Sequence, residues 1–442
     1  MRVVLIRAKY HSVWEPINLM YLSAFIKEFC TPSPQVEILD AYFDSDEAIV
    51  EKGAEADFVG LSGTTPQLAH MIELAKRIKT QSPKARTILG GFGPSLQIHR
   101  CMNSAYVDHV VVGEGEPALL AILRGEASGK LVSAEPIDDV DTISFPDREA
   151  IDLERYIQIA EREEGRRVTS VVSERGCPFG CTFCAEGEFG TIWRKASEKE
   201  GNIQYQRPIR MRLRQPSEIV REMVEVRDRF GITFFKFSDA ETNPTKRHFL
   251  GICQEMVRQG LNIPWGCNMR ADKLNDEMCE WAVKANCQEF WIGVESGSPT
   301  IQRHINKGTT IDMIRRAFQV SRQYGIQRRA YCLLGTPPES YETIRETEEL
   351  LDEIEPDVVG FSILAPYPGT PYWGPDYEDL DWSKVDEYSN TIWSSQYLSN
   401  EELRAEQARL MEKYSTKLAP IVRKKATLGI IQPARTLDSY TS

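Results

Sequence analysis

The chain has 442 residues, of which 41% are hydrophobic and 27% are charged, and its formal net charge is −12. These values are typical of a soluble globular protein with two or three domains, and the acidic balance argues against a broad nucleic-acid partner. No apolar run approaches the about eighteen residues of a membrane span, and the apolar stretch at the N-terminus is too short for a signal peptide, so we expect a cytoplasmic protein.

Residues 1–125 alternate strand and helix patterns with short connections. Apolar runs predict strands at residues 3–6, 36–39, 58–61, 87–89 and 109–112. Because parallel strands need helical crossovers, five such units predict a doubly wound, Rossmann-like sheet. A ligand of such a sheet lies across the carboxyl ends of the strands.

Glycine-rich loops follow three of these predicted strands. They read Ser62-Gly-Thr-Thr-Pro-Gln67, Gly90-Gly-Phe-Gly-Pro-Ser95 and Gly113-Glu-Gly-Glu-Pro117. Glycine lets backbone amides approach a ligand closely, and the helix N-terminus that follows favours phosphate. Taken singly, each loop is only a turn signal.

The rest of the chain is predicted to form a linker, a second α/β domain and a tail. Periodicity fades over residues 126–165, which we interpret as the linker. Within residues 166–372, strand patterns at 168–173, 233–237, 263–267, 289–293, 329–334 and 357–363 alternate with helix patterns at 217–230, 245–259, 274–285, 311–324 and 340–354. Six such units predict a partial TIM-like barrel, with its site at the carboxyl ends of the strands. Residues 373–442 form a C-terminal extension with a helix near 401–418.

Three cysteines follow the first strand of the predicted barrel. Cys177, Cys181 and Cys184 are separated by three and then two residues. A short loop can turn three sulfurs toward one point, as an iron–sulfur cluster requires, and the missing fourth thiol leaves one iron open to another ligand. The alternatives are a zinc site or three buried cysteines. A zinc site usually shows a second ligand pair nearby, which this sequence lacks.

The Cys-x3-Cys-x2-Cys pattern after an apolar strand resembles the radical S-adenosylmethionine (SAM) enzyme superfamily, in which the open iron of a [4Fe–4S] cluster chelates SAM. Gly-Val-Glu-Ser-Gly, Leu-Gly-Thr-Pro-Pro-Glu-Ser and Pro-Tyr-Pro-Gly-Thr-Pro, in this order after the cysteines, resemble motifs of radical enzymes with an N-terminal cobalamin-binding domain. The first-domain loops, with Glu15-Pro-Ile-Asn-Leu-Met-Tyr-Leu, resemble that domain. The Asp-x-His-x-x-Gly signature is absent, so the resemblance implies cobalamin held without a lower histidine ligand.

The resemblance also implies site residues. The cluster ligands would be Cys177, Cys181 and Cys184. The implied SAM contacts are Phe183, Ser238, Asp239, Glu241, Asn268, Arg270, Glu295, Ser296, Leu334 and Gly335. The implied cobalamin contacts are Asn18, Leu19, Ser62, Thr64, Thr65, Gly90, Gly91, Phe92, Gly93, Ser95, Glu114, Gly115 and Glu116. A first domain that keeps this fold but has lost cobalamin is the alternative.

The function implied is that of a cobalamin-dependent radical SAM methyltransferase. It would act through a 5′-deoxyadenosyl radical on an unactivated carbon of a small molecule or peptide, with flavodoxin or ferredoxin as electron donor. The alternatives are a radical cyclisation, ring contraction or other rearrangement, and a non-catalytic corrinoid or iron–sulfur carrier. A tRNA methylthiotransferase would need further cluster cysteines in the first domain, where only Cys30 and Cys101 occur.

The polar segment 186–215 is predicted to be either the substrate-selecting element or a disordered insert. Its basic run, residues 207–214, is predicted to be a solvated face or a substrate-side loop. The motifs identify neither the substrate nor a catalytic acid or base, and they leave the oligomeric state open.

Overall fold

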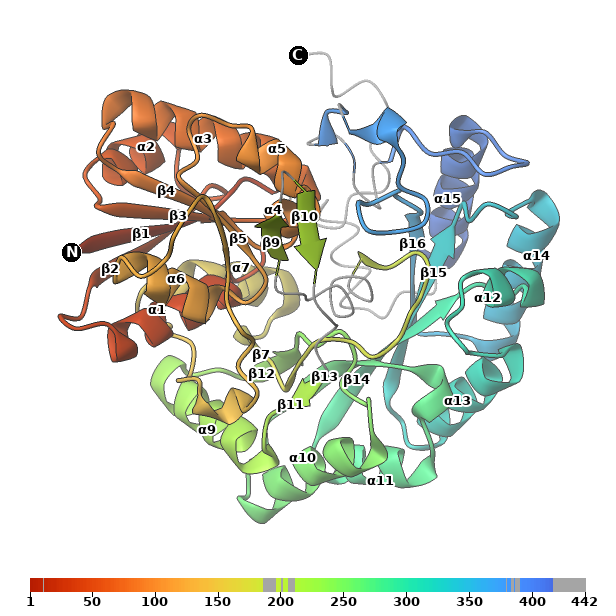
Figure 1. The fold of residues 1–442 in the computed structure, drawn as a ribbon. Helices are drawn as coiled ribbons and strands as arrows, with labels where there is room; N and C mark the ends of the chain where they lie inside the picture. Colours follow the sequence, from red (N-terminus) through yellow and green to blue (C-terminus); the bar gives the residue numbers. More distant parts are fainter. Residues whose placement is uncertain are drawn as a thin grey trace.

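The structure is a computed structural model that describes residues 1–10, 12–185, 196–199, 202–205, 211–378, 380–382, 385 and 390–415. Most of the segment 186–215 and the end of the predicted tail helix therefore lie outside the described residues. Two six-stranded parallel sheets organise the chain (Figure 1). Among the described residues, none of the helices combines the length and hydrophobicity that a membrane span requires.

The first sheet has the strand order β2-β1-β3-β4-β5-β6 and is parallel throughout. Alternate residues of β1 face opposite sides: Val4 and Ile6 pack with α2, α3 and α5, whereas Val3 and Leu5 pack with α1 and α6. The predicted doubly wound fold is therefore confirmed. Its elements are β1 (Arg2–Arg7), α1 (Ile17–Phe29), β2 (Gln35–Asp40), α2 (Asp46–Ala54), β3 (Phe58–Ser62), η1 (Thr65–Gln67), α3 (Leu68–Gln81), β4 (Arg86–Gly90), α4 (Phe92–Leu96), α5 (Ile98–Met102), β5 (His109–Val112), α6 (Gly115–Leu123) and β6 (Leu131–Ser133).

The segment expected to be a linker, residues 126–165, contains regular structure. Strand β6 pairs with β5 and adds a sixth strand where the sequence predicted five. The short helix η2 (Val140–Thr142) and helix α7 (Leu153–Glu164) follow. Three residues of β6 are too few to show a period-two pattern, which is why the strand was not predicted from sequence.

The second sheet, here called the barrel sheet, has the order β16-β15-β14-β13-β12-β7 and is open, as predicted for a partial barrel. Thr245, Asn275, Thr310 and Ser340 cap the N-termini of α10, α11, α13 and α14 with their side chains. The elements are β7 (Val168–Val171), α9 (Pro216–Phe230), β12 (Phe234–Phe237), α10 (Lys246–Arg258), β13 (Trp265–Met269), η3 (Ala271–Lys273), α11 (Asp276–Lys284), β14 (Cys287–Glu295), α12 (Pro299–His304), α13 (Ile311–Gln323), β15 (Gln327–Leu334), α14 (Tyr341–Ile354) and β16 (Val358–Ile363).

Smaller elements lie around the barrel sheet. Strands β8 (Glu174–Arg175) and β11 (Arg212–Leu213) pair in antiparallel fashion, so the two ends of the segment that connects them lie side by side. The hairpin β9 (Ala196–Lys199) and β10 (Asn202–Tyr205) lies beside β6 of the first sheet. In the tail, η4 (Pro375–Tyr377) precedes α15 (Asn400–Ser415), which packs on β16.

Arg148 joins the two sheets. Its guanidinium donates to the Thr169 hydroxyl at 2.8 Å and to the Ser170 carbonyl at 2.7 Å, both on β7. It also pairs with Glu222 of α9 at 3.1 Å and, at 3.4 Å, with Glu15 of the first domain. Burying charges is costly unless they are paired, so this network holds the domains in one relative orientation.

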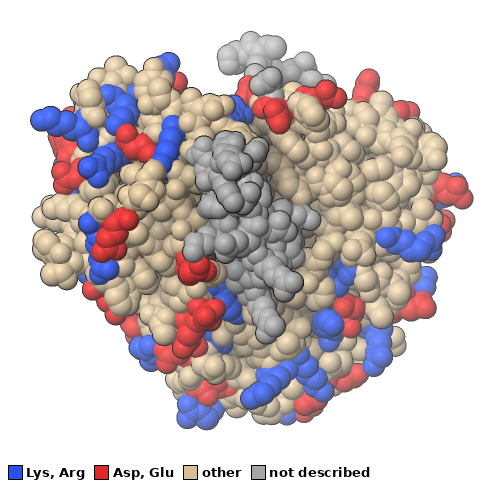
Figure 2. All heavy atoms as spheres, viewed as in Figure 1, with Lys and Arg blue, Asp and Glu red and all other residues tan. Residues whose placement is uncertain are grey.

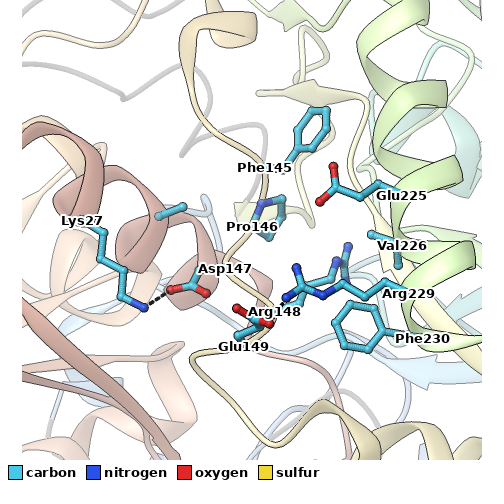
Figure 3. A pocket seen from close by; sticks show the side chains of 11 residues that line it. Lys27, Phe145, Pro146, Asp147, Arg148, Glu149, Glu225, Val226, Arg229 and Phe230 are labelled. Carbon is cyan, nitrogen blue, oxygen red and sulfur yellow. Dashed lines mark hydrogen bonds and ion pairs between the residues drawn. The ribbon is translucent and has the colours of Figure 1, made fainter.

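A pocket lies at the same junction, between α1 and α9 (Figure 3). Lys27 and Asp147 form an ion pair on its α1 side, and Arg229 and Glu149 form one on its α9 side. None of the predicted site residues lines it. We therefore treat it as part of the domain junction.

Candidate functional site

The cysteine loop, residues 177–184, follows β7 and β8 at the carboxyl edge of the barrel sheet. Cys177, Cys181 and Cys184 are half-buried and form no disulfide bond. The segment after α12 holds the loop: the Thr182 N–H donates to the Ile305 carbonyl at 3.0 Å, and the Asn306 amide donates to the Gly180 carbonyl at 3.1 Å. The loop is therefore bound to the barrel on both sides of Cys181.

Two further side chains complete the support of this loop. The Thr182 hydroxyl lies 2.8 Å from the Tyr372 hydroxyl, which lies 3.2 Å from His304 Nε2. Phe183, an implied SAM contact, is partly buried against the apolar core of the barrel. The loop is thus contacted by residues of α12 and of the segment after β16, which are far from it in sequence.

The surroundings of the loop suit thiolates that bind a cationic partner. Burial raises the pKa of the Cys177 thiol to about 12 and also raises that of Cys181, while Lys307 and Arg270 oppose the rise at Cys181. Thiols of this kind ionise when a metal centre supplies compensating charge. No three His, Cys, Asp or Glu side chains of the described residues are arranged to hold a single metal ion. In a [4Fe–4S] cluster each cysteine binds a different iron, so three spaced thiols fit that group.

Glu241, an implied SAM contact, lies unsatisfied beside the loop. Its side chain is buried, and neither carboxylate oxygen has a hydrogen-bond partner. Arg270 Nε is 3.6 Å from Glu241 Oε2, and burial raises the pKa of this carboxyl to about 7. Buried polar atoms without partners are rare in native proteins. An ammonium group would satisfy both oxygens, so Glu241 fits the amino group of SAM.

Other implied SAM contacts already have partners within the protein. Asp239 accepts from the N–H and the hydroxyl of Ser173 at 2.7 and 2.6 Å, so it fixes the end of β7. Ser296 is buried and lies 2.9 Å from the Thr347 hydroxyl of α14. Ser238 is exposed, and the Asn268 amide donates to the Asp239 carbonyl at 2.9 Å.

The remaining implied SAM contacts end β14 and β15. Glu295 has the left-handed φ of 61° and pairs with Lys307 at 2.5 Å. Leu334 is buried, and the Gly335 carbonyl accepts from the Trp393 indole at 2.5 Å. Lys307 also donates to the Gly293 carbonyl at 2.8 Å. The sequence analysis missed Lys307, because a lysine before glycine in a loop carries no recognisable signal.

In the first sheet, the loops after β3 and β4 pack on each other. The Asn18 amide donates to the Ser62 hydroxyl at 2.9 Å. A Cβ on Gly91 would lie 2.8 Å from Ser62 Oγ, and one on Gly93 would lie 2.6 Å from the Thr64 carbonyl oxygen. These glycines therefore allow the two loops to approach, which gives one continuous edge at the carboxyl ends of the strands.

The other implied cobalamin contacts differ in their exposure. Leu19, Thr65 and Ser95 are buried, whereas Gly90 and Phe92 are half-buried. Ser95 receives a long hydrogen bond of 3.4 Å from the Gly113 N–H. Leu19 belongs to the apolar core with α6 and β1, so its side chain supports the fold.

Glu114 and Glu116, also implied cobalamin contacts, are tied to the other domain. Glu116 pairs with Arg175 of β8 at 2.5 Å, and Glu114 pairs with Arg212 of β11 at 2.5 Å. Glu114 also accepts from the Ile137 N–H at 2.8 Å. Helix α6 begins at Gly115. Both carboxylates thus connect the start of α6 to the base of the cysteine loop.

Arg212 and Arg214 correct the prediction for the basic run. Both belong to its described part and were expected in a solvated or substrate-side loop. Arg214 is buried, pairs with Glu222 at 2.7 Å and donates to the Tyr21 hydroxyl at 3.3 Å. Figure 2 shows basic and acidic side chains interspersed over this face of the molecule. Arg212 and Arg214 face inward because Glu114 and Glu222 lie opposite them, which a local sequence window does not show.

His70 lies on α3, near the loop after β3, but both of its ring nitrogens have partners. Nδ1 accepts from the Lys9 N–H at 2.9 Å, and Nε2 lies 3.1 Å from Asp46. A histidine ligand needs one free ring nitrogen. His70 is thus a structural residue.

Comparison with known families assigns both domains. Residues 171–351 match the model of the Radical SAM superfamily, the class that the open barrel and cysteine loop define. Residues 3–123 match the B12 binding domain model, and the chain therefore belongs to the radical SAM enzymes that carry an N-terminal B12-binding domain. The three-thiol loop and the order of the domains agree with this assignment.

Curated relatives share most of the chain. An uncharacterized methyltransferase of Pyrococcus horikoshii is 26% identical over 385 residues, which cover 81% of this chain and 77% of the relative. The anaerobic magnesium-protoporphyrin IX monomethyl ester cyclase of Rubrivivax gelatinosus is 27% identical over 404 residues, covering 83% and 68%. The relatives of this chain thus carry both methyltransferase and cyclase names.

A solved structure shares the two-domain fold. The radical SAM methyltransferase TsrM of Kitasatospora setae, with cobalamin and a [4Fe–4S] cluster bound, aligns with a TM-score of 0.68 and 16% identity, covering 95% of this chain and 89% of that chain. At this identity the similarity establishes the fold.

Proposed function

We propose that the protein is a cobalamin-dependent radical SAM methyltransferase that acts on a small molecule. The observation that carries the proposal is the direct link between the two candidate cofactor edges: Glu114 and Glu116 of the B12-type sheet pair with Arg212 and Arg175 beside the cysteine loop. A methyl donor in the first domain and a radical source in the second must reach the same substrate carbon. This interface holds their two edges together.

The chain's residues have distinct tasks in this proposal. Cys177, Cys181 and Cys184 would hold the cluster. Glu241 would accept hydrogen bonds from the amino group of SAM through its two unsatisfied oxygens. Arg270 would bind the carboxylate of SAM with the N–H groups that do not already donate to Asp272 and Lys307. The loops of Ser62, Thr64 and residues 90–95 would hold cobalamin. When bound, the cluster with SAM supplies a 5′-deoxyadenosyl radical, and cobalamin supplies the methyl group.

The methyl transfer is supported by the relatives that are named as methyltransferases. The cyclase relatives favour a second candidate, a radical rearrangement without methyl transfer. Both candidates need one electron per radical, so we expect a flavodoxin or ferredoxin as the donor. The acidic chain and the inward-facing Arg212 and Arg214 do not favour a nucleic-acid substrate.

The test is the cofactor content and the products of anaerobically reconstituted protein. Cobalt near one per chain, together with S-adenosylhomocysteine and 5′-deoxyadenosine, would support the methyltransferase. 5′-Deoxyadenosine alone, with cobalamin bound, would favour the rearrangement. A reduced cluster that does not cleave SAM would favour a non-catalytic carrier. Cys30→Ala should retain iron, whereas Cys181→Ala should lose it.

A further inference from the structure

The two faces of the barrel sheet differ sharply in chemistry. Phe235, Cys267, Phe290, Ala330 and Phe361 face the helices and belong to the apolar core. The alternate residues form the opposite face, here called the inner face. Because partners in a parallel register share a face, the inner face can be assigned in layers.

The lowest layer of the inner face is charged and internally paired. Lys236, Gly266 and Glu289 are register partners. Glu164 pairs with Lys236 at 2.9 Å and with Arg166 at 3.1 Å, and Arg166 also pairs with Glu289 at 2.8 Å. The second carboxylate oxygen of Glu289 accepts from the Trp291 indole at 3.1 Å. Both carboxylates of this layer therefore have their partners.

The next layer toward the carboxyl edge contains Asn268, Trp291 and Arg329, which are register partners across β13, β14 and β15. Arg329 makes no ion pair within the described residues, and its Nε is buried without a hydrogen-bond partner. Its guanidinium interacts with the Tyr331 side chain through a hydrogen bond, and the carboxylates of Glu289 and Glu164 attract it electrostatically. With Arg329, the two layers hold three cations and two carboxylates, so together they carry one net positive charge.

The layer above contains small and aromatic residues. Tyr331 is the register partner of Gly293 and of Gly360, and all three are half-buried. A Cβ on Gly360 would lie 3.5 Å from the Tyr331 ring. Arg329 lies five residues before the end of β15, which places it about 16 Å below the edge where the cysteine loop lies.

We propose that Arg329 binds an oxyanion group of the substrate, a carboxylate or a phosphate, beside Trp291 and Tyr331 on the inner face of the barrel sheet. A guanidinium presents a planar fork of N–H donors that suits either group. The aromatic side chains offer contact area to the apolar part of the same molecule. This inference rests on the proposed function, because it takes the inner face as the side that receives the substrate.

The test uses matched acids and amides as probes. Binding of 3-phenylpropionate, phenyl phosphate and the neutral 3-phenylpropionamide is measured by calorimetry on the full chain with its cofactors loaded. We expect at least one acid to bind about tenfold or more tightly than the amide, as a charge-assisted pair implies. Arg329→Gln should abolish this preference, and Arg329→Lys should retain part of it. The tighter acid identifies the oxyanion.

Arg328→Gln is the matched control. Arg328 is adjacent in sequence, lies on the opposite face and pairs with Asp357 at 3.0 Å. Its loss should leave the preference for acids intact, which separates local binding from a general change in charge. Thermal melting of each variant shows whether it folds. If Arg329→Gln does not fold, Arg329→Lys replaces it as the test variant.

Three outcomes would overturn the proposal: no preference for acids in the wild type, the same preference in Arg329→Gln, or binding of inorganic phosphate as tight as that of phenyl phosphate. The last would mean a simple anion site without a substrate role. Cobalt content and S-adenosylhomocysteine formation are measured separately on the wild type. Their absence would contradict the methyltransferase but not the binding preference, so the two failures are distinguishable.

Discussion

The guanidinium carbon of Arg270 lies 3.6 Å from the centre of the Phe179 ring, so the residue that follows β13 stacks on the cysteine loop. The same side chain donates to the Lys307 carbonyl at 2.6 Å and to Asp272 at 2.9 Å. Arg270 therefore aligns the loop with the end of β13 before any ligand binds. Such preorganisation reduces the entropy that SAM binding would otherwise cost.

Glu241→Gln tests the amino-group contact. The substitution preserves the shape of the side chain but removes its charge, so we expect SAM affinity to fall about 10- to 100-fold, the usual range for a charge-assisted hydrogen bond. Equilibrium binding of SAM to the protein with its cluster in place measures this. Glu342→Gln, on an exposed position of α14, is the control. Equal affinity in both variants would contradict the role of Glu241.

Gly93→Ala tests the packing of the first-domain loops. The new Cβ would lie 2.6 Å from the Thr64 carbonyl oxygen, a backbone atom that cannot move alone. We expect cobalt content to fall severalfold while iron content stays near that of the wild type. Gly374→Ala, where no atom lies within 4 Å of the added Cβ, is the matched control. Full cobalt loading in Gly93→Ala would show that this contact is unimportant.

Arg148→Ala tests the domain junction. It would leave Glu15 buried without its cation, whereas Glu222 would keep its pair with Arg214. We expect a loss of about 3–5 kcal/mol in the free energy of unfolding, because removal of one partner strands the other charge. Urea denaturation measures the loss, and limited proteolysis should cut the segment 126–165 faster. Arg322→Ala, an exposed pair with Glu355, should cost about 1 kcal/mol or less.

Glu339 predicts a pH dependence of stability. It lies between β15 and α14, is buried, and its carboxyl has a pKa raised by burial from 4.5 to about 7. The folded state therefore binds this proton more tightly than the unfolded chain. The stability that this bound proton contributes is fully present below about pH 4.5 and is lost as the pH rises to about 7. Above that pH the free energy of unfolding is lower by up to about 3 kcal/mol.

Glu339→Gln removes this titration. Relative to the wild type, the variant should gain stability between about pH 5 and about pH 8, as urea midpoints of the cofactor-free protein would show. Gln can still accept from the Gly335 N–H, which donates to Glu339 at 3.3 Å. A stability difference that stays constant with pH would mean that this carboxyl titrates normally in the folded protein.

Local patterns predicted most strands and helices because each repeats a short-range period. The strand predicted at residues 329–334 is β15 (Gln327–Leu334), and the helix predicted at 340–354 is α14 (Tyr341–Ile354). β6 and α7 were assigned to a linker because one is too short and the other lies in a charged, turn-rich stretch. Periodicity reports which face is buried, and it needs several residues to do so.

The sequence by itself determined the three thiols of the cysteine loop, the two α/β domains and their order, because covalent spacing and hydrophobic period are local properties. Only the tertiary structure decided that Glu114 and Glu116 pair with Arg212 and Arg175, that Lys307 adjoins Glu295, and that Arg329 lacks an ion-pair partner within the described residues. Those relationships join residues that are far apart in the chain. Charge pairing depends on distance and burial in space, and neither can be read from a short window of sequence.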